Sequence, residues 1–320
     1  MARHPLVRTL TILGLSASLF SNIFFALSPV FGKILLQSLT PPTLLAIGTL
    51  FSVLLVFFFF GIVNEFKKLK KIPTSHIFLL IIIGISSGVI APLLSLWGLK
   101  MIQASDASLI GNISPIFLAI LGIIFLKEKV SRNQIFGSIA MLIGVAFIAT
   151  HGFSVPLKLS GGYVFIIAAG FFYSISDTIF KKYLHHISPE LVIFIRNFIG
   201  SLVLFTVVPF LFGFSHDITP LSNKHILIFL CGYVFFGIFL GQLLWYKALD
   251  IISITINSVI ALTYPIFGVF FAWLILDEKI MMYHFWGGTL IFGGLFLTLL
   301  HNRKYPHHHL LQRFKHGFHM

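Results

Sequence analysis

The segment Ser114–Lys129, SPIFLAILGIIFLKEK, returns near the other end of the chain as Tyr264–Lys279, YPIFGVFFAWLILDEK. The second copy lies 150 residues after the first, and both keep Pro-Ile-Phe near the start and Glu-Lys at the end. Each copy has most of the roughly 20 apolar residues that a membrane-spanning helix needs. The chain therefore contains an internal repeat, and the repeated unit is an apolar span.

The overall composition excludes a water-soluble globular protein. The mean hydropathy is +1.01, and 58% of the residues are hydrophobic while only 10% are charged. Soluble domains carry about 25% charged residues. Because lipid cannot satisfy bare backbone groups, long apolar runs are expected to be helices. The sequence therefore predicts an all-α polytopic membrane protein, and its single cysteine, Cys231, excludes an internal disulfide.

Apolar runs of spanning length follow one another along the chain. Capping residues with proline or an acid mark breaks at Thr40–Pro42, Lys71–Ser75 and Ser188–Glu190. The first run is too long for a signal-peptide core and is expected to be retained. We predict ten transmembrane helices, at 11–36, 42–63, 75–99, 104–126, 132–151, 160–184, 190–213, 225–248, 254–276 and 281–301.

The repeat extends over the whole chain. At the offset of 150, Leu99 matches Leu249, and at an offset of 148 Lys33 matches Lys181. Each half has five spans, and because five is odd the second half enters the membrane upside down; such inverted repeats are typical of secondary transporters. We predict an N-terminus at 1–10, a first repeat at 11–155, a second repeat at 156–301 and a basic, His-rich tail at 302–320.

The basic residues orient the chain in the bilayer. With the N-terminus inside, sixteen Lys and Arg residues fall on the inner side and five on the outer side. Inner loops are the ones enriched in Lys and Arg. We therefore expect both termini in the cytoplasm. The net charge of +13 lies in short clusters between spans, which argues against a nucleic-acid partner.

Three features together resemble the EamA-type drug/metabolite transporters over about residues 12–301. They are the doubled Pro-Ile-Phe block, the Lys after the first span of each half, and the motif at Ser188–Arg196. The resemblance implies a ten-helix inner-membrane carrier of small metabolites, often an exporter, with a central cavity lined by the third, fourth, eighth and ninth spans. The chain departs from its own repeat at Gly48, where the second half has Arg196, and its first span lacks the glutamate of the four-helix multidrug relatives.

Two prolines fall near the middle of their spans, Pro115 and Pro265. Proline frees a backbone carbonyl and kinks the helix. The kinks could serve packing alone or could line a wet cavity. Asn112 near Pro115, and Asn257 and Tyr264 near Pro265, favour the cavity, because polar groups at this depth usually face inward.

Two tryptophans, Trp97 and Trp245, also have two possible interpretations. They could line the cavity, or, because they lie toward span ends, they could belong to an interfacial aromatic belt. Cavity lining is favoured for Trp97 because Pro92 and Ser95 share its helix. The candidate substrate-binding residues are Trp97, Asn112, Pro115, Asp177, Arg196, Gln242, Trp245, Asn257, Tyr264 and Pro265.

Asp177 and Arg196 are the ionisable residues deepest in the spans. Each lies nine to ten residues from the turn between their helices, so an antiparallel hairpin places them at the same depth. An unpaired charge in lipid costs roughly 2.5–3.5 kcal/mol. We therefore expect a structural ion pair. The alternative is that one of them contacts a charged group of the substrate or changes partner during gating.

Other motifs carry no expected chemistry. The G-x-S-x-G match at Gly84–Gly88 lies inside an apolar span, whereas a nucleophile elbow needs a strand–turn–helix. Glu128 and Glu278 adjoin lysines at opposite faces and are interpreted as helix-end anchors. The histidines of the tail lack Cys or carboxylate partners, so a basic tail near anionic lipid is favoured over a metal site. We expect no catalytic residues, no metal and no cofactor.

The predicted function is transport of a small amphiphilic or zwitterionic metabolite, amino-acid-like or drug-like, in the direction of efflux. One alternative is an uptake or exchange carrier for a nucleotide-like cofactor or sugar phosphate, which would need more cationic groups in the cavity. A lipid-modifying membrane enzyme would need a clustered catalytic set, which the sequence does not offer. The expected partners are a small-molecule substrate and the lipid bilayer, with the chain as a monomer or a homodimer.

Overall fold

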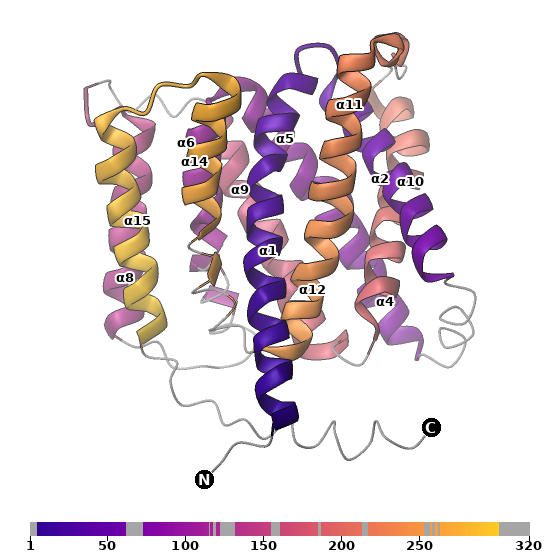
Figure 1. Cartoon of the computed structure of the whole chain (residues 1–320), viewed down its shortest axis with the longest axis horizontal. Coiled ribbons are helices and arrows are strands. Elements are labelled where there is room, and N and C mark those ends of the chain that lie inside the picture. The colour runs from indigo at the N-terminus through magenta and orange to yellow at the C-terminus, as the bar shows by residue number, and fades with distance from the viewer. Residues whose placement is uncertain are drawn as a thin grey trace.

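The computed structural model describes residues 5–61, 73–114, 116–117, 120–121, 132–154, 161–184, 187–212, 217–252, 257, 260–261 and 263–300, and these contain helices and no strand (Figure 1). The prediction of an all-α polytopic membrane protein is confirmed. Among these described residues, six helices are long and apolar enough to cross a membrane, at Leu10–Leu35, Pro41–Phe60, Thr74–Met101, Gly161–Leu184, Pro189–Val207 and Lys224–Ile251. Two shorter apolar helices, Ile135–Ala149 and Thr263–Leu276, accompany them.

The first half begins with two long helices whose ends follow from local chemistry. The Thr40 side chain caps the second helix by accepting the Thr43 N–H at 3.3 Å, and prolines occupy its first positions. Gly61, with φ of 52°, ends this helix in the left-handed conformation. The elements are α1 (Pro5–Leu35), α2 (Pro41–Phe60), α4 (Thr74–Ile85), η1 (Ser86–Ile90), α5 (Ala91–Met101), α6 (Ala104–Ile110), η2 (Gly111–Ile113) and α8 (Arg132–Ala149).

The second half repeats this order. Its elements are α9 (Gly161–Ile179), η3 (Phe180–Leu184), α10 (Pro189–Phe212), a short η4 (Thr219–Ser222), α11 (Lys224–Gly232), η5 (Tyr233–Gly241), α12 (Gln242–Ile251), α14 (Thr263–Leu276) and α15 (Met282–Leu300). The third span of each half is one helix interrupted by a π-helical stretch, η1 or η5. Such π-helical stretches occur frequently at functional sites.

The two halves interlock rather than sit side by side. The most extensive helix pairs are α8 with α15, α2 with α10, α5 with α9, α1 with α12, α14 and η5, and α6 with α14, and every one of them joins a helix of one half to a helix of the other. Figure 1 shows α8 alongside α15 and α6 alongside α14. The core of the molecule is therefore built between the halves.

Glycines allow the closest approaches, and they do so symmetrically. A Cβ on Gly144 in α8 would lie 2.7 Å from the carbonyl oxygen of Gly287 in α15. A Cβ on Gly14 would strike Ile251 and Ile252, and one on Gly162 would strike Met101 and Ile102, at the matching positions of the other half. The first helix of each half thus packs against the end of the third span of the other half.

Candidate functional site

A cavity of about 300 Å³ lies between the two halves. It is lined from both of them, by α1, α2, η1, α5, α6, η2, α9, α10, η5, α12 and α14. Its volume is at the lower end of the range found for small-molecule sites. Its polar lining residues are Asn22, Ser28, Thr49, Ser87, Ser95, Asn112, Ser114, Tyr173, Asp177, Arg196, Asn197, Tyr233, Gln242, Trp245, Tyr246, Asn257 and Tyr264.

The π-helical stretches η1 and η5 both line this cavity. Ser87 and Gly88 line it from η1, and Gly237 and Ile238 line it from η5. Gly88 also sets the distance to α10, because a Cβ there would lie 2.6 Å from the backbone carbonyl oxygen of Arg196. A side chain at this position would push α10 away, so the glycine fixes the depth at which Arg196 enters the cavity.

Two lining residues carry formal charge, Asp177 from α9 and Arg196 from α10. Arg196 is 7% exposed, and its Nη2 donates to the Ser87 carbonyl oxygen at 2.6 Å. Its Nε is buried and has no hydrogen-bond partner among the described residues. Asp177 lies near the Trp245 side chain and within electrostatic reach of Arg196. The cavity thus holds an anion and a cation, and Arg196 has a hydrogen-bond partner of its own.

The expected direct ion pair between Asp177 and Arg196 is therefore corrected. Within the part of the chain that the structure describes, ion pairs join Lys247 to Glu190 and His284 to Asp106, and none joins these two residues. The antiparallel hairpin does bring both to one cavity, as the spacing indicated. Arg196 takes its hydrogen-bond partner, Ser87, from the third span of the first half, and Asp177 lies near Trp245 of the third span of the second half.

Two buried amides have unfilled hydrogen-bonding capacity. Asn112 is 8% exposed and Asn257 1% exposed, and the Nδ2 of each has no partner among the described residues. The Oδ1 of Asn257 accepts from Ser18 Oγ at 2.5 Å. A buried donor without an acceptor is unfavourable. Asn112, Asn257 and Arg196 all line the cavity, and each has a buried donor without a partner among the described residues.

Seven of the ten candidate residues line the cavity, namely Asn112, Asp177, Arg196, Gln242, Trp245, Asn257 and Tyr264. Trp97 does not, although Pro92 and Ser95 do, and this corrects the expectation for Trp97. With 3.6 residues per turn, a residue two positions past Ser95 faces away from it. Trp97 packs instead against Phe165, with ring centroids 6.3 Å apart.

The two prolines differ from the expectation in other ways. Pro265 is buried in α14 but is not among the residues that line the cavity. Pro115 lies outside the described residues. Pro29 inside α1, which was not among the predicted residues, does line the cavity. Also missed were Tyr173, Tyr233, Tyr246, Asn22 and Asn197, whose signal was a polar group within an otherwise apolar span.

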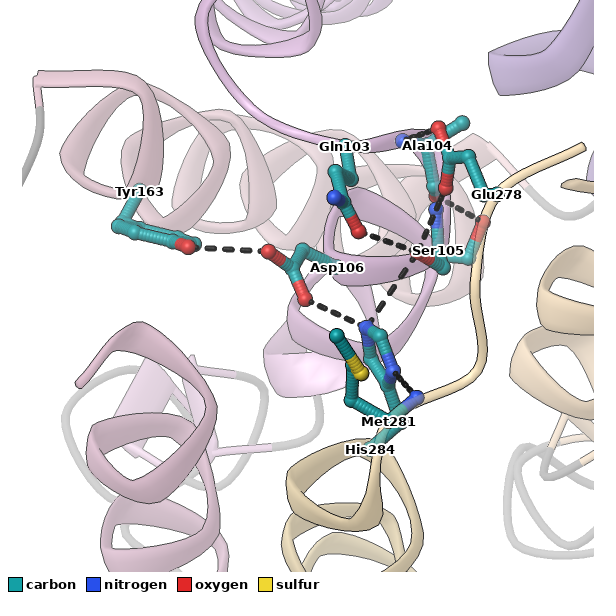
Figure 2. Close-up of polar contacts among 9 residues, drawn as sticks. Gln103, Ala104, Ser105, Asp106, Tyr163, Glu278, Met281 and His284 are labelled. Atoms are coloured by element: carbon teal, nitrogen blue, oxygen red, sulfur yellow. Dashed lines mark hydrogen bonds and ion pairs between the residues drawn. The ribbon is translucent and has the colours of Figure 1, made fainter. Parts of the chain in front are cut away.

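Glu278 does more than anchor a helix end (Figure 2). Its Oε1 accepts the Ala104 N–H at 2.8 Å, and its Oε2 accepts the N–H and the hydroxyl of Ser105 at 2.9 and 2.6 Å. These are orphan donors at the start of α6, so a carboxylate from the second half caps a helix of the first. Its counterpart Glu128 and the His-rich tail lie outside the described residues.

Comparison with known proteins gives a consistent result. The model of the EamA-like transporter family matches the chain twice, at residues 12–150 and 160–300, once in each half. An uncharacterised transporter of Synechocystis sp. is 28% identical, over 75% of this chain and 70% of that protein. One of Methanothermobacter thermautotrophicus is 27% identical, over 87% and 83%.

Two further likenesses are more distant. A riboflavin transporter, ImpX, of Fusobacterium nucleatum is 24% identical, over 75% of this chain and 82% of that protein. A solved crystal structure that is 15% identical superposes with a TM-score of 0.62, over 93% of this chain and 98% of that one. At such identity the solved structure bears on the fold alone.

Proposed function

The chain belongs to the EamA-like transporter family, and on that premise we propose that it moves a small zwitterionic or amphiphilic metabolite out of the cell. Transport would proceed by alternating access, in which the two inverted halves expose the cavity to one side of the membrane and then to the other. We propose that the carrier resides in the inner (plasma) membrane with both termini in the cytoplasm, as the distribution of Lys and Arg indicates.

The observation that carries the proposal is the pair of opposite charges in one cavity. Asp177 and Arg196 both line it, and neither neutralises the other by direct contact. Charges in a membrane protein are costly unless a partner is present at least part of the time. A zwitterion supplies both partners at once, its cationic group toward Asp177 and its carboxylate toward Arg196.

The remaining lining fits the rest of such a molecule. The free donors of Arg196 Nε, Asn112 and Asn257 can serve carboxylate or carbonyl oxygens. Trp245, Tyr246 and other aromatic residues offer flat apolar surface for the body of an amphiphilic solute. No set of described residues suggests a lipid-modifying enzyme, and transport accounts for the cavity without one.

Uptake of a nucleotide-like cofactor or a sugar phosphate is a second candidate, favoured by the relative named as a riboflavin transporter. Phosphate recognition usually calls for several cations or donors. Among the described residues that line the cavity, Arg196 is the one cation. Lys33 and Lys181 donate to backbone carbonyl oxygens instead. The charge balance therefore favours the zwitterion over a phosphorylated solute.

The test is a ligand screen followed by transport with matched variants. Purified protein is heated with amino acids, cationic dyes, riboflavin, nucleotides and sugar phosphates, and the stabilising class is then followed into proteoliposomes. We expect stabilisation by zwitterions. Asp177→Asn and Arg196→Gln should each abolish it, while Gly293→Ala, which faces open space, should not. Stabilisation by sugar phosphates alone would favour the second candidate instead.

A further inference from the structure

A second buried polar cluster lies outside the cavity. It occupies what we call the cap end of the bundle, where α1, α5 and α14 end and α6, α9 and α15 begin (Figure 1). Its members are Asp106 on α6, Tyr163 on α9 and His284 on α15, and they are 2%, 5% and 3% exposed. None of the three is among the residues that line the cavity.

Asp106 joins the other two (Figure 2). Its Oδ2 accepts the Tyr163 hydroxyl at 2.9 Å, and its Oδ1 lies 3.0 Å from His284 Nε2. Asp106 belongs to the first half, whereas Tyr163 and His284 belong to the second. Both contacts therefore tie the halves together at this end.

The orientation of His284 is fixed from its other side. The backbone N–H of Met281 donates to His284 Nδ1 at 2.9 Å, a capping-box contact at the start of α15. Because Nδ1 accepts, the ring proton resides on Nε2 and is donated to Asp106. The histidine is thus held as a donor aimed at the carboxylate.

The inverted repeat provides an internal comparison for this cluster. At the offsets of 150 and 148, Asp106, His284 and Tyr163 correspond to Ile256, Gln134 and Leu15. The capping pair nearby is present in both halves, since Ser105 corresponds to Thr255 and Glu278 to Glu128. The repeat unit is therefore built without an Asp–His–Tyr cluster at the opposite end, and the cluster is an addition specific to the cap end.

The cluster is also linked to the cavity through α6. Asp106 is followed directly by Ala107, which lines the cavity, and η2 continues the same segment with Gly111 and Asn112, which line it too. A solute that shifts this segment would move Asp106 against Tyr163 and His284. Moving α6 away from α9 and α15 at the cap end would break both contacts of Asp106.

We infer that Asp106, Tyr163 and His284 form a gate that holds the cap end of the cavity closed, and the repeat-related residues Ile256, Gln134 and Leu15 do not reproduce this cluster. The inference rests on the alternating access proposed above. It makes the three residues positioning residues of the transport cycle. It also means that the two ends of the cavity differ in the free energy needed to open them, although the halves are related by a repeat.

The experiment uses two cysteine reporters at equivalent positions in full-length protein with Cys231→Ser. Leu99→Cys and Leu249→Cys both replace cavity-lining residues, the first near the cap end and the second near the opposite end. Their rates of modification by a water-soluble thiol reagent are measured in nanodiscs. Asp106→Asn and His284→Gln should each raise the modification rate of Leu99→Cys about tenfold and lower that of Leu249→Cys. His284→Gln introduces the residue that the other half has at the equivalent position, Gln134.

The opposite changes distinguish a gate from a general structural role. A loosened fold would raise both rates, and that result overturns the inference, as does no change in either. Tyr163→Phe removes a single hydroxyl and should act in the same direction more weakly, so it decides the question if the other variants fail to fold. If the protein transports in proteoliposomes but the variants leave both cysteine modification rates unchanged, the gate alone is refuted. If the protein does not transport and the two modification rates never change in opposite directions, alternating access itself is refuted.

Discussion

Lys33 and Lys181 make the same contact in opposite halves of the chain. Lys33 Nζ donates to the carbonyl oxygens of Leu99 and Ile102 at 2.8 and 2.5 Å, and Lys181 Nζ donates to that of Leu249 at 2.7 Å. The last carbonyls of a helix lack partners within the helix, and a cation there also complements the helix dipole. In each half, the first span therefore secures the end of the third.

Replacing either lysine should destabilise the protein by a similar amount. We expect Lys33→Met and Lys181→Met each to cost about 1.5–3 kcal/mol, the value of a hydrogen bond to a charged group. Thermal unfolding of the purified protein measures this. Lys224→Met is the control, because Lys224 is exposed at the start of α11. Equal losses in all three variants would contradict the assignment.

The approach of η1 to α10 should tolerate no added methyl group. A Cβ at Gly200 would lie 2.8 Å from the Gly88 carbonyl oxygen, a backbone atom that cannot rotate away. We expect Gly200→Ala to destabilise by about 1–3 kcal/mol or more. A Cβ at Gly293 would face open space, so Gly293→Ala should raise the free energy of unfolding by up to about 1 kcal/mol through helix propensity. Opposite shifts in melting temperature would bear this out, and a stable Gly200→Ala would not.

The stability that the Glu278 cap contributes should depend on how many acceptor oxygens the side chain at this position offers. Both carboxylate oxygens are used by Ala104 and Ser105. Glu278→Gln keeps one oxygen and should lose less stability than Glu278→Ala, for which we expect about 1–2 kcal/mol. Thermal unfolding of the two variants side by side tests the order. If glutamine were as harmful as alanine, the charge rather than the hydrogen bonds would be responsible.

The two tryptophans should respond differently to the same change. Trp245→Phe keeps a ring at the cavity but removes the donor that faces Asp177. We expect about a tenfold loss of substrate affinity with little loss of stability. Trp97→Phe should leave affinity unchanged, because Trp97 packs on Phe165 away from the cavity. Titration of substrate against both variants decides, and equal effects would count against the cavity assignment.

Inverted topology predicts which segments share a side of the membrane. With Cys231→Ser as background, Lys129→Cys and Lys279→Cys should react with an impermeant thiol reagent from opposite sides, and Lys279→Cys from outside the cell. Reaction of both from one side would be incompatible with inversion. The measurement needs intact cells and inverted vesicles from the same preparation.

Much of the fold follows from hydropathy and the repeat. The chain break at Thr40–Pro42 follows from the residue types there, and the equivalence of Lys33 and Lys181 follows from the fixed offset of the repeat. The π-helical stretches do not, because η1 and η5 each lie inside one continuous apolar span, Thr74–Met101 and Lys224–Ile251. Glu278 shows the same limit, since its acceptor role depends on a helix start that is 174 residues away.

The site was predictable in its members more than in its contacts. Spacing around a turn was enough to bring Asp177 and Arg196 to a common cavity. It could not reveal that Ser87 would accept from Arg196, because that carbonyl lies 109 residues away. Trp97 failed for a simpler reason, in that sharing a helix with Ser95 does not mean sharing a face.

The interlocked arrangement of the helices also constrains biosynthesis. A ribosome that has completed α8 has inserted a whole repeat whose main packing partners have not yet been made, because those partners are α9, α10, α12, α14 and α15. Membrane insertion and tertiary assembly are separable stages for helical proteins. Here assembly can finish only when the last span emerges and lies along α8, so a transcript truncated before Met282 would yield inserted helices without a carrier.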